Sequence, residues 1–244
     1  MIGVIDSGSG GANVINECLK HFNEDFVYLV DNKNCPYGNK NIKILDQIIK
    51  DNIDFLLSNF NLDILIIGCN TASSLINYKM LEQINLPVIK TFPNLKSLIV
   101  QKGDKLLFAT KNTIKQSNWV KYYLFNYKFK TLWIKNLPKY IDEKLSKNCQ
   151  IDEKNLQKTL KNSFINKKYK NIQNIALGCT HFKHIENEIK NMFNNKINIF
   201  ECEPQVANIC KFLIRKNKNK SSLKIILTSE DNTLKSFIQN QVNI

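Results

Sequence analysis

Short apolar runs alternate with longer amphipathic stretches along the chain, and this alternation constrains the fold most strongly. Between most of the runs lie helical patterns such as residues 41–60, where apolar side chains recur every three or four positions. Alternating strands and helices of this kind predict parallel sheets covered by helices. The predicted strands are residues 2–5, 26–30, 64–67, 88–90, 106–109, 131–134, 175–177, 197–200 and 225–227.

The number of predicted strands, nine, favours two sheets over one. The pattern is interrupted at residues 91–97, where Pro93 follows a short strand, and a return to the first unit is predicted near Pro204. We therefore expect an α/β protein of two similar, doubly wound parallel-sheet domains that face each other across an active-site cleft. The first domain would contain residues 1–93 and about 206–244, and the second about 94–205.

The charge of the chain invites a nucleic-acid interpretation, because 35 basic residues against 21 acidic ones give a formal net charge of +14. Lysine, asparagine and isoleucine are abundant everywhere, however. Only residues 212–224 form a dense basic run, which we expect to be an exposed helix end and loop. We therefore expect weak, salt-sensitive binding to polyanions and no specific nucleic-acid partner.

Two further features bear on where the protein works. Residues 1–11 contain neither a basic n-region nor a long apolar h-region, and no segment approaches the roughly 18 apolar residues that span a bilayer. Seven cysteines, an odd number spread over 244 residues, do not resemble the framework of a small disulfide-stapled domain. We expect a cytoplasmic protein with free thiols and no membrane partner.

One turn occurs twice. Residues 68–71 (GCNT) and 178–181 (GCTH) each follow an apolar strand and precede a helical pattern. Because ligands bind at the carboxyl ends of parallel strands, two facing halves would place Cys69 and Cys179 on either side of a cleft. Paired thiols suit the removal of a proton from one face of a carbon and the delivery of another to the opposite face. Helix N-termini can lower a thiol pKa and can bind a substrate carboxylate.

Two other interpretations of these cysteines stay open. A single cysteine at a strand end most often packs in a core. A metal site formed by Cys179, His181 and His184, with or without Cys202, lacks a standard ligand spacing. The repetition of the turn favours proton transfer, for which neither a metal nor a redox cofactor is needed.

Polar and aromatic residues follow two other predicted strands. Residues 4–11 (VIDSGSGG) bring Asp6 and Ser7 to the same edge of the sheet. This glycine-rich motif lacks the Lys and Ser/Thr of a P-loop, and Asn13 occupies the last glycine position of a dinucleotide fingerprint. Nucleotide binding is therefore disfavoured, and a tight turn explains the glycines. Residues 36–38 (PYG) make a rigid aromatic loop, beside which we interpret Cys35 as incidental.

Taken in order, these motifs resemble the glutamate racemase family within the aspartate/glutamate racemase superfamily, and the resemblance extends over the whole chain. It implies a two-domain α/β homodimer, free of pyridoxal phosphate and metal, that interconverts L- and D-glutamate and in wall-bearing bacteria supplies D-glutamate for peptidoglycan. The motifs are IDSGSGG (5–11), PYG (36–38), GCNTAS (68–73), ATKNTIKQS (109–117), LGCTH (177–181) and LTSED (227–231).

The resemblance also implies roles for individual residues. Cys69, supported by Asp6, would be the base for D-glutamate, and Cys179, supported by His181, the base for L-glutamate. His181 favours glutamate, because relatives that act on aspartate generally carry a carboxylate there. The implied substrate contacts are Asp6, Ser7, Tyr37, Gly38, Asn70, Thr71, Thr180 and His181. A family acidic residue near the cleft corresponds to Asp142 or Glu143, and the sequence does not choose between them.

The chain departs from the family pattern in three places while retaining all four proposed acid/base residues. Ser9 replaces a small aliphatic residue, Phe182-Lys183 replaces Tyr-Pro, and residues 228–231 (TSED) replace TSGD. These changes bear on loop shape, substrate affinity and regulation. His21 and His184 receive no role. The alternatives are racemisation of another amino acid, such as aspartate, and a non-catalytic basic binding protein built on the same scaffold.

Overall fold

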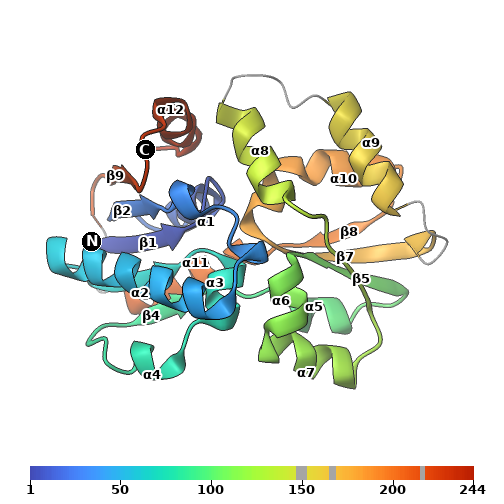
Figure 1. Cartoon of the computed structure of the whole chain (residues 1–244), viewed down its shortest axis with the longest axis horizontal. Helices are drawn as coiled ribbons and strands as arrows, with labels where there is room; N and C mark the ends of the chain where they lie inside the picture. Colours follow the sequence, from blue (N-terminus) through green and yellow to red (C-terminus); the bar gives the residue numbers. More distant parts are fainter. Residues whose placement is uncertain (147–152, 165–168, 215–217) are drawn as a thin grey trace.

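The computed structural model describes residues 1–146, 153–164, 169–214 and 218–244, and these residues form two parallel sheets that lie side by side (Figure 1). The first sheet has the strand order β4-β3-β1-β2-β9. Its strands are β1 (Ile2–Asp6), β2 (Asp25–Val30), β3 (Ile64–Ile67), β4 (Val88–Lys90) and β9 (Ser222–Leu227). The second sheet has the order β6-β5-β7-β8. Its strands are β5 (Asp104–Ala109), β6 (Lys130–Leu132), β7 (Ile172–Gly178) and β8 (Asn198–Phe200).

Every pair of neighbouring strands is parallel, which confirms the predicted α/β fold class. All nine predicted strands are present, with some differences in length. Strand β7 begins three residues earlier than predicted because it is paired on both sides, with β5 and β8. Strand β6 ends at Leu132, before the predicted Ile134, because it is an edge strand with one neighbour and the next residue, Trp133, is exposed.

Part of the basic run 212–224 was predicted wrongly. Strand β9 already begins at Ser222, where it pairs with Asp25 of β2, so Lys224 lies in a strand and not in a loop. Helix α11 (Glu203–Leu213) ends inside the run and exposes Phe212, as expected of a helix end. Residues 215–217, including Arg215, lie outside the described residues.

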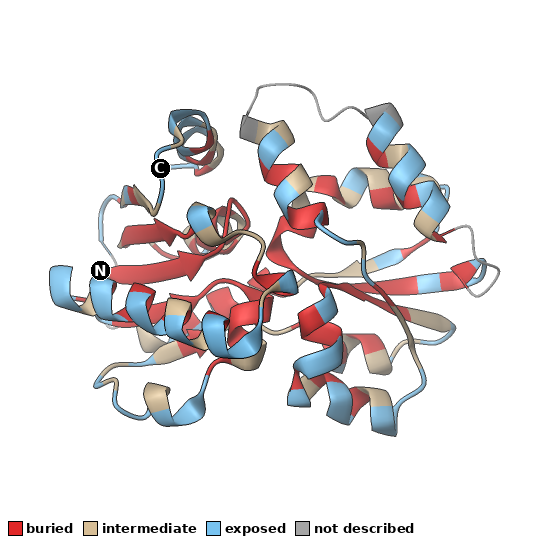
Figure 2. Ribbon diagram, viewed as in Figure 1, coloured by how far each residue is buried: buried red, intermediate tan, exposed pale blue. Residues whose placement is uncertain are grey.

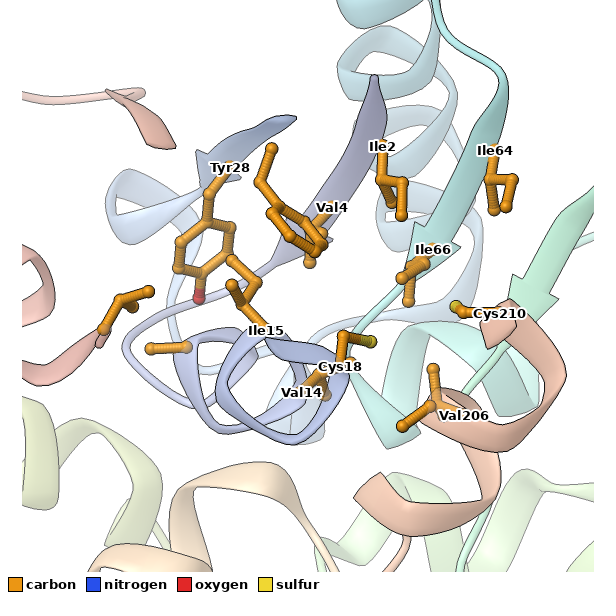
Figure 3. Close-up of a cluster of buried hydrophobic side chains, with 14 of the residues drawn as sticks. Ile2, Val4, Val14, Ile15, Cys18, Tyr28, Ile64, Ile66, Val206 and Cys210 are labelled. Atoms are coloured by element: carbon orange, nitrogen blue, oxygen red, sulfur yellow. The ribbon is translucent and has the colours of Figure 1, made fainter. Parts of the chain in front are cut away.

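The first sheet buries apolar side chains on both faces, because successive residues of a strand point to opposite sides. On β1, Val4 belongs to the core under helices α1 (Gly11–Leu19), α11 and α12 (Asn232–Gln241), whereas Ile5 belongs to the core under α2 (Ile42–Asn59) and α3 (Asn70–Leu75). Figure 3 shows the first of these cores, with Cys18 of α1 and Cys210 of α11 among its buried side chains. Helix α4 (Tyr78–Leu81) lies before β4.

Helix α2 illustrates how the sequence sets a helix. Asn41 caps it by accepting a hydrogen bond from the Lys43 N–H at 2.9 Å, as a short polar side chain does at a helix start. Its buried apolar residues recur every three or four positions and so form one face against the sheet. They are Leu45, Ile49, Ile53 and Leu56. The predicted helical pattern over residues 41–60 is confirmed.

The second sheet is also covered on both faces. One core lies under α8 (Leu137–Ser146), α9 (Glu153–Phe164) and α10 (Glu186–Met192), and the other under α5 (Leu95–Ile99), α6 (Lys111–Gln116) and α7 (Asn118–Asn126). Figure 2 shows buried strands between helices whose outer faces are exposed. Among the described residues, no helix combines the length and apolar character needed to cross a bilayer.

The chain passes from the first sheet to the second between β4 and β5, and returns between β8 and β9. After the return, Val206, Ala207 and Cys210 of α11 pack in the same core as α1. The domain boundaries expected near residues 93 and 206 stay predictions. The carboxyl ends of β1 and β7 meet at the centre of the molecule, where Thr180 donates a hydrogen bond to Asp6.

Candidate active site

Asp6 is the last residue of β1 and is completely buried. Its Oδ2 accepts a hydrogen bond from Thr180 Oγ1 at 2.8 Å, and its Oδ1 accepts one from the backbone N–H of Ser7 at 2.6 Å. Burial raises the pKa of Asp6, although the charge of His181 and both hydrogen bonds oppose the shift. The residue therefore joins the first sheet to the turn that follows β7.

Cys69 stands between β3 and the N-terminus of α3, in extended backbone. The preceding Gly68 N–H donates to the carbonyl of Ile5 at 2.7 Å, which continues the pairing of β3 with β1. Burial raises the pKa of Cys69 strongly and the charge of Asp6 adds to the effect, against a hydrogen bond from the backbone N–H of Ala72. The side chain is therefore a thiol, and so a proton donor, at neutral pH.

Cys179 occupies the matching place after β7, at the start of the 3-10 helix η4 (Thr180–Ile185). The helical pattern that the sequence shows after Cys179 thus begins as a 3-10 helix and continues as α10. Its Sγ lies 3.8 Å from Nδ1 of His181. Both cysteines are only 6% exposed, and the charge of Cys179 contributes to the raised pKa of Cys69, so the two side chains interact.

His181 is paired with Asp142 of α8. The distance between His181 Nε2 and Asp142 Oδ2 is 3.1 Å, and both side chains are buried. Burial lowers the pKa of His181, but the charge and hydrogen bond of Asp142 outweigh it and hold that pKa well above its usual value. Burial alone would raise the pKa of Asp142. The charge and hydrogen bond of His181 and the hydrogen bond of Ser9 outweigh burial, so the pKa of Asp142 is lowered. The pair is an imidazolium and a carboxylate.

Of the two acidic residues that the sequence left open, Asp142 is therefore the one beside the site. Glu143 is exposed and forms an ion pair with Lys139 at 3.7 Å. Asp142 is also held from the first sheet's side, where Ser9 Oγ donates a hydrogen bond to its Oδ1 at 2.5 Å. Ser9, noted in the sequence only as a departure, thus holds the carboxylate that faces His181.

His184, which received no role from the sequence, lies on the far side of Ser9. Its Nε2 is 3.1 Å from Ser9 Oγ. Burial, followed by the charge of His181, lowers the pKa of His184 to about 4, so it is neutral at physiological pH. His184 supports the Ser9 loop and does not carry a charge into the site.

The remaining predicted contacts divide into two groups. Thr71 Oγ1 lies 2.8 Å from Thr110 Oγ1 and 3.2 Å from Thr113 Oγ1, so hydroxyls from both sheets meet there. Asn70 donates to the sulfur of Cys202 at 3.4 Å, and its Oδ1 is buried without a partner in the described structure. The sequence assigned no substrate contact to Thr110, Thr113 or Cys202, because their proximity to these residues depends on how the sheets face each other.

The aromatic loop is held by hydrogen bonds on the first sheet's own side, and the substrate contacts expected of Tyr37 and Gly38 stay predictions. The Tyr37 hydroxyl donates to Asp31 Oδ2 at 2.6 Å and accepts from the Asn52 amide at 3.0 Å, so it is held within the first sheet's own side chains. Gly38 lies so close to Thr110 that an added Cβ would stand 2.5 Å from the Thr110 Cβ. Gly38 is therefore required for the contact between this loop and the second sheet.

The metal site considered from the sequence is not formed. In the described part of the chain, one group of three metal-binding residue types is close enough to hold an ion, and it contains Cys35, Asp142 and His181. Neither His184 nor Cys202 belongs to it. Cys35, interpreted from the sequence as incidental, lies with its Sγ 3.9 Å from Asp142 Oδ2.

The relatives found by comparing sequences and the solved structures found by comparing folds are of the same kind. No protein-family model matches the chain. A glutamate racemase of Clostridium botulinum strain Kyoto is 32% identical over 206 residues, which is 82% of this chain and 78% of the relative. A glutamate racemase of Clostridium novyi is 30% identical over 95% of this chain and 92% of the relative. The Escherichia coli glutamate racemase, solved with L-glutamate and the activator UDP-MurNAc-Ala, matches with a TM-score of 0.85 at 19% identity, over 99% of this chain and 94% of that chain.

Proposed function

The chain belongs to the glutamate racemase family, and on that premise we propose that it interconverts L- and D-glutamate by two-base proton transfer at Cα. The observation that carries the two-base proposal is the pair of buried thiols, Cys69 and Cys179, each at the carboxyl end of a strand in a different sheet. Two bases are needed because a proton leaves one face of Cα and another arrives on the opposite face.

Each direction of the reaction uses the two thiols in opposite roles. With L-glutamate, the Cys179 thiolate takes the Cα proton and becomes a thiol, while the Cys69 thiol gives its proton to the other face and becomes a thiolate. D-glutamate reverses these roles. Burial of Cys69 supports its starting role as donor, and the His181 imidazolium, 3.8 Å from Cys179, is placed to stabilise a thiolate there.

Substrate binding in this proposal uses hydrogen-bond donors in place of arginine. Ser7, Asn70, Thr71 and Thr180 supply hydroxyl and amide groups beside the thiols, and the chain has only one arginine, Arg215. Donors fixed around the substrate α-carboxylate would stabilise negative charge that develops at Cα, which is usually the largest contribution to such catalysis. The unpartnered Asn70 Oδ1 is available to accept from the substrate ammonium group.

We extend the proposal to the setting of the enzyme. It works in the cytoplasm as a homodimer without pyridoxal phosphate or metal and supplies D-glutamate for peptidoglycan, as the family resemblance implies. The buried His181 beside Asp142 supports glutamate over aspartate as substrate. Faster turnover of L-aspartate than of L-glutamate by the purified protein would contradict this assignment.

Alanine variants test the two thiols. Cys69→Ala and Cys179→Ala should each lower racemisation by at least about a hundredfold, because positioned acid/base groups supply a factor of roughly 10² to 10⁴. Cys210→Ala removes a buried thiol from the core between α1 and α11 and serves as the control, with turnover per folded molecule close to that of the wild type. Circular dichroism follows the reaction, and rapid turnover by either active-site variant would refute the two-base proposal.

A further inference from the structure

Three metal-ligand side chains form a cluster at the edge of the proposed active site, and one of them, Cys35, has no part in the proton transfer described above. Cys35 comes from the loop between η1 (Asn32–Asn34) and η2 (Tyr37–Asn39) on the first sheet's side. Asp142 and His181 come from α8 and η4 on the second sheet's side. One ligand atom from each residue lies within 4.8 Å of the other two.

We propose that Cys35, Asp142 and His181 form an inhibitory binding site for a zinc ion, which closes the active site when it is filled. The binding part of this inference stands on the cluster alone, and the inhibitory part rests on the proposed racemase function. A thiolate, an imidazole and a carboxylate are the three ligand types that zinc takes in proteins. Magnesium and calcium need several oxygen ligands and are disfavoured by this set.

The distances suit a zinc ion without large rearrangement. Tetrahedral zinc with bonds of about 2.0 to 2.3 Å holds neighbouring ligand atoms roughly 3.4 to 3.6 Å apart. The His181 Nε2 to Asp142 Oδ2 distance is 3.1 Å, and the Cys35 Sγ to Asp142 Oδ2 distance is 3.9 Å. Small side-chain shifts would bring all three atoms to zinc, with the fourth position left for water. The Cys35 thiol and the Nε2–H of the His181 imidazolium would each release a proton to solvent.

The surroundings of the cluster supply both orientation and access. Ser9 Oγ donates to the second oxygen of Asp142, Oδ1, at 2.5 Å, and leaves Oδ2 facing His181 and Cys35. Partners of this kind commonly orient metal ligands. A pocket of about 230 Å³ reaches Cys35 and Asp142 from the surface. The carboxylates of Glu143, Glu230 and Asp231 line this pocket together with Lys33 and Lys139, so acidic side chains outnumber basic ones along the path to Asp142.

Zinc at this position would stop the reaction in two ways. It would occupy Nε2 of His181 and replace the Asp142 partner, on which the proposed support of Cys179 depends. It would also bind residues from both sides of the cleft at once, so that glutamate could neither enter nor leave. Inhibition should therefore be reversed when a chelator removes the metal.

Zinc titration of the full-length reduced protein tests the site, with competition by a chromophoric chelator as the readout. The wild type and Cys210→Ala should bind one zinc ion with equal affinity, and Cys35→Ser should bind it at least about a hundredfold more weakly, because loss of even a supporting partner costs 10- to 100-fold. Asp142→Asn, a second variant, should also bind more weakly. Equal zinc affinity in Cys35→Ser would place the metal on the catalytic thiols and overturn the proposal, as would no binding by the wild type.

Racemisation measured alongside binding separates this proposal from the proposed function. In EDTA the wild type and Cys35→Ser should have equal activity. Equimolar zinc should inhibit the wild type at least about tenfold and leave Cys35→Ser active, and magnesium should affect neither. Inhibition of both proteins alike would overturn the regulatory site. No racemisation in EDTA by folded wild type would refute the proposed function and leave the zinc titration to decide the binding site.

Discussion

At the scale of single residues, the two turns of similar sequence create different environments for their thiols. Cys69 faces the buried carboxyl of Asp6, and Cys179 faces the imidazolium of His181. A catalyst that must donate at one face of a carbon and accept at the other needs such a difference. The donor and acceptor roles that we propose for the resting enzyme follow from these neighbours and not from the cysteines themselves.

Behind Asn70 and Cys202 lies a buried carboxyl, Glu203, which makes stability depend on pH. Burial raises its pKa to about 7, with the charge of Glu201 adding and the N-terminus of α11 opposing. An acid whose pKa is raised by folding stabilises the folded protein fully below its unfolded pKa, and this contribution is lost as pH rises through the folded value. The stability that Glu203 contributes therefore falls as pH rises from the ordinary pKa of glutamate to about 7.

Glu203→Gln should remove this dependence, since the variant side chain is neutral throughout. The free energy of unfolding of the variant relative to the wild type should increase by roughly 2 to 3 kcal/mol between about pH 5 and about pH 8. Urea unfolding of both proteins at the two pH values measures the difference. A difference that stays constant with pH would show that Glu203 titrates as an exposed carboxyl does.

At the scale of elements, the loop between β1 and α1 has to fit against η4 and α8. Gly8 allows this contact, because an added Cβ would overlap Asp142 Oδ2 and His181 Nε2. Gly8→Ala should therefore force the pair apart and lower racemisation by about a hundredfold, since a displacement of about 1 Å in a catalytic group can cost that much.

Gly3→Ala is the matched control for this variant. Gly3 lies in β1, the strand that leads into this loop, and an added Cβ would meet only the ends of leucine side chains, the nearest being Leu62 Cδ1 at 2.6 Å. It should lose some stability and keep its turnover per folded molecule. Circular dichroism checks folding while the optical rotation of glutamate reports activity, and full activity in folded Gly8→Ala would contradict the account of the loop.

The elements were predictable to different degrees. Strand β3 and the last residues of β7, 175–177, are apolar runs followed by glycine and cysteine, so local sequence predicted them. The place of Asp142 was not predictable, because it depends on how α8 lies against a loop 133 residues away. The same reason explains why Cys35 was interpreted as incidental. A short loop in one sheet carries no local signal of the His181 that it meets.

At the scale of the whole molecule, the alternation of strands and helices was enough to predict two parallel sheets. The facing of the two thiols, expected from the repeated turn, stays a prediction. The direct contacts between the residues around the first sheet and those around the second were not predictable. Both thiols are almost fully buried, and Asp6, Ser9 and Cys35 contact residues of the second sheet's side directly. We therefore predict that these contacts separate when glutamate reaches the thiols.

The measurement that tests the two-base proposal most directly is solvent deuterium incorporation at Cα during racemisation of L-glutamate in D₂O. Early in the reaction, before product returns, D-glutamate should carry deuterium at Cα while the remaining L-glutamate keeps hydrogen, because one thiol removes the proton and a second, exchanged with solvent, supplies the deuteron. Deuterium entering L-glutamate as fast as D-glutamate, or D-glutamate that retains the original hydrogen, would contradict proton transfer by two opposed cysteines.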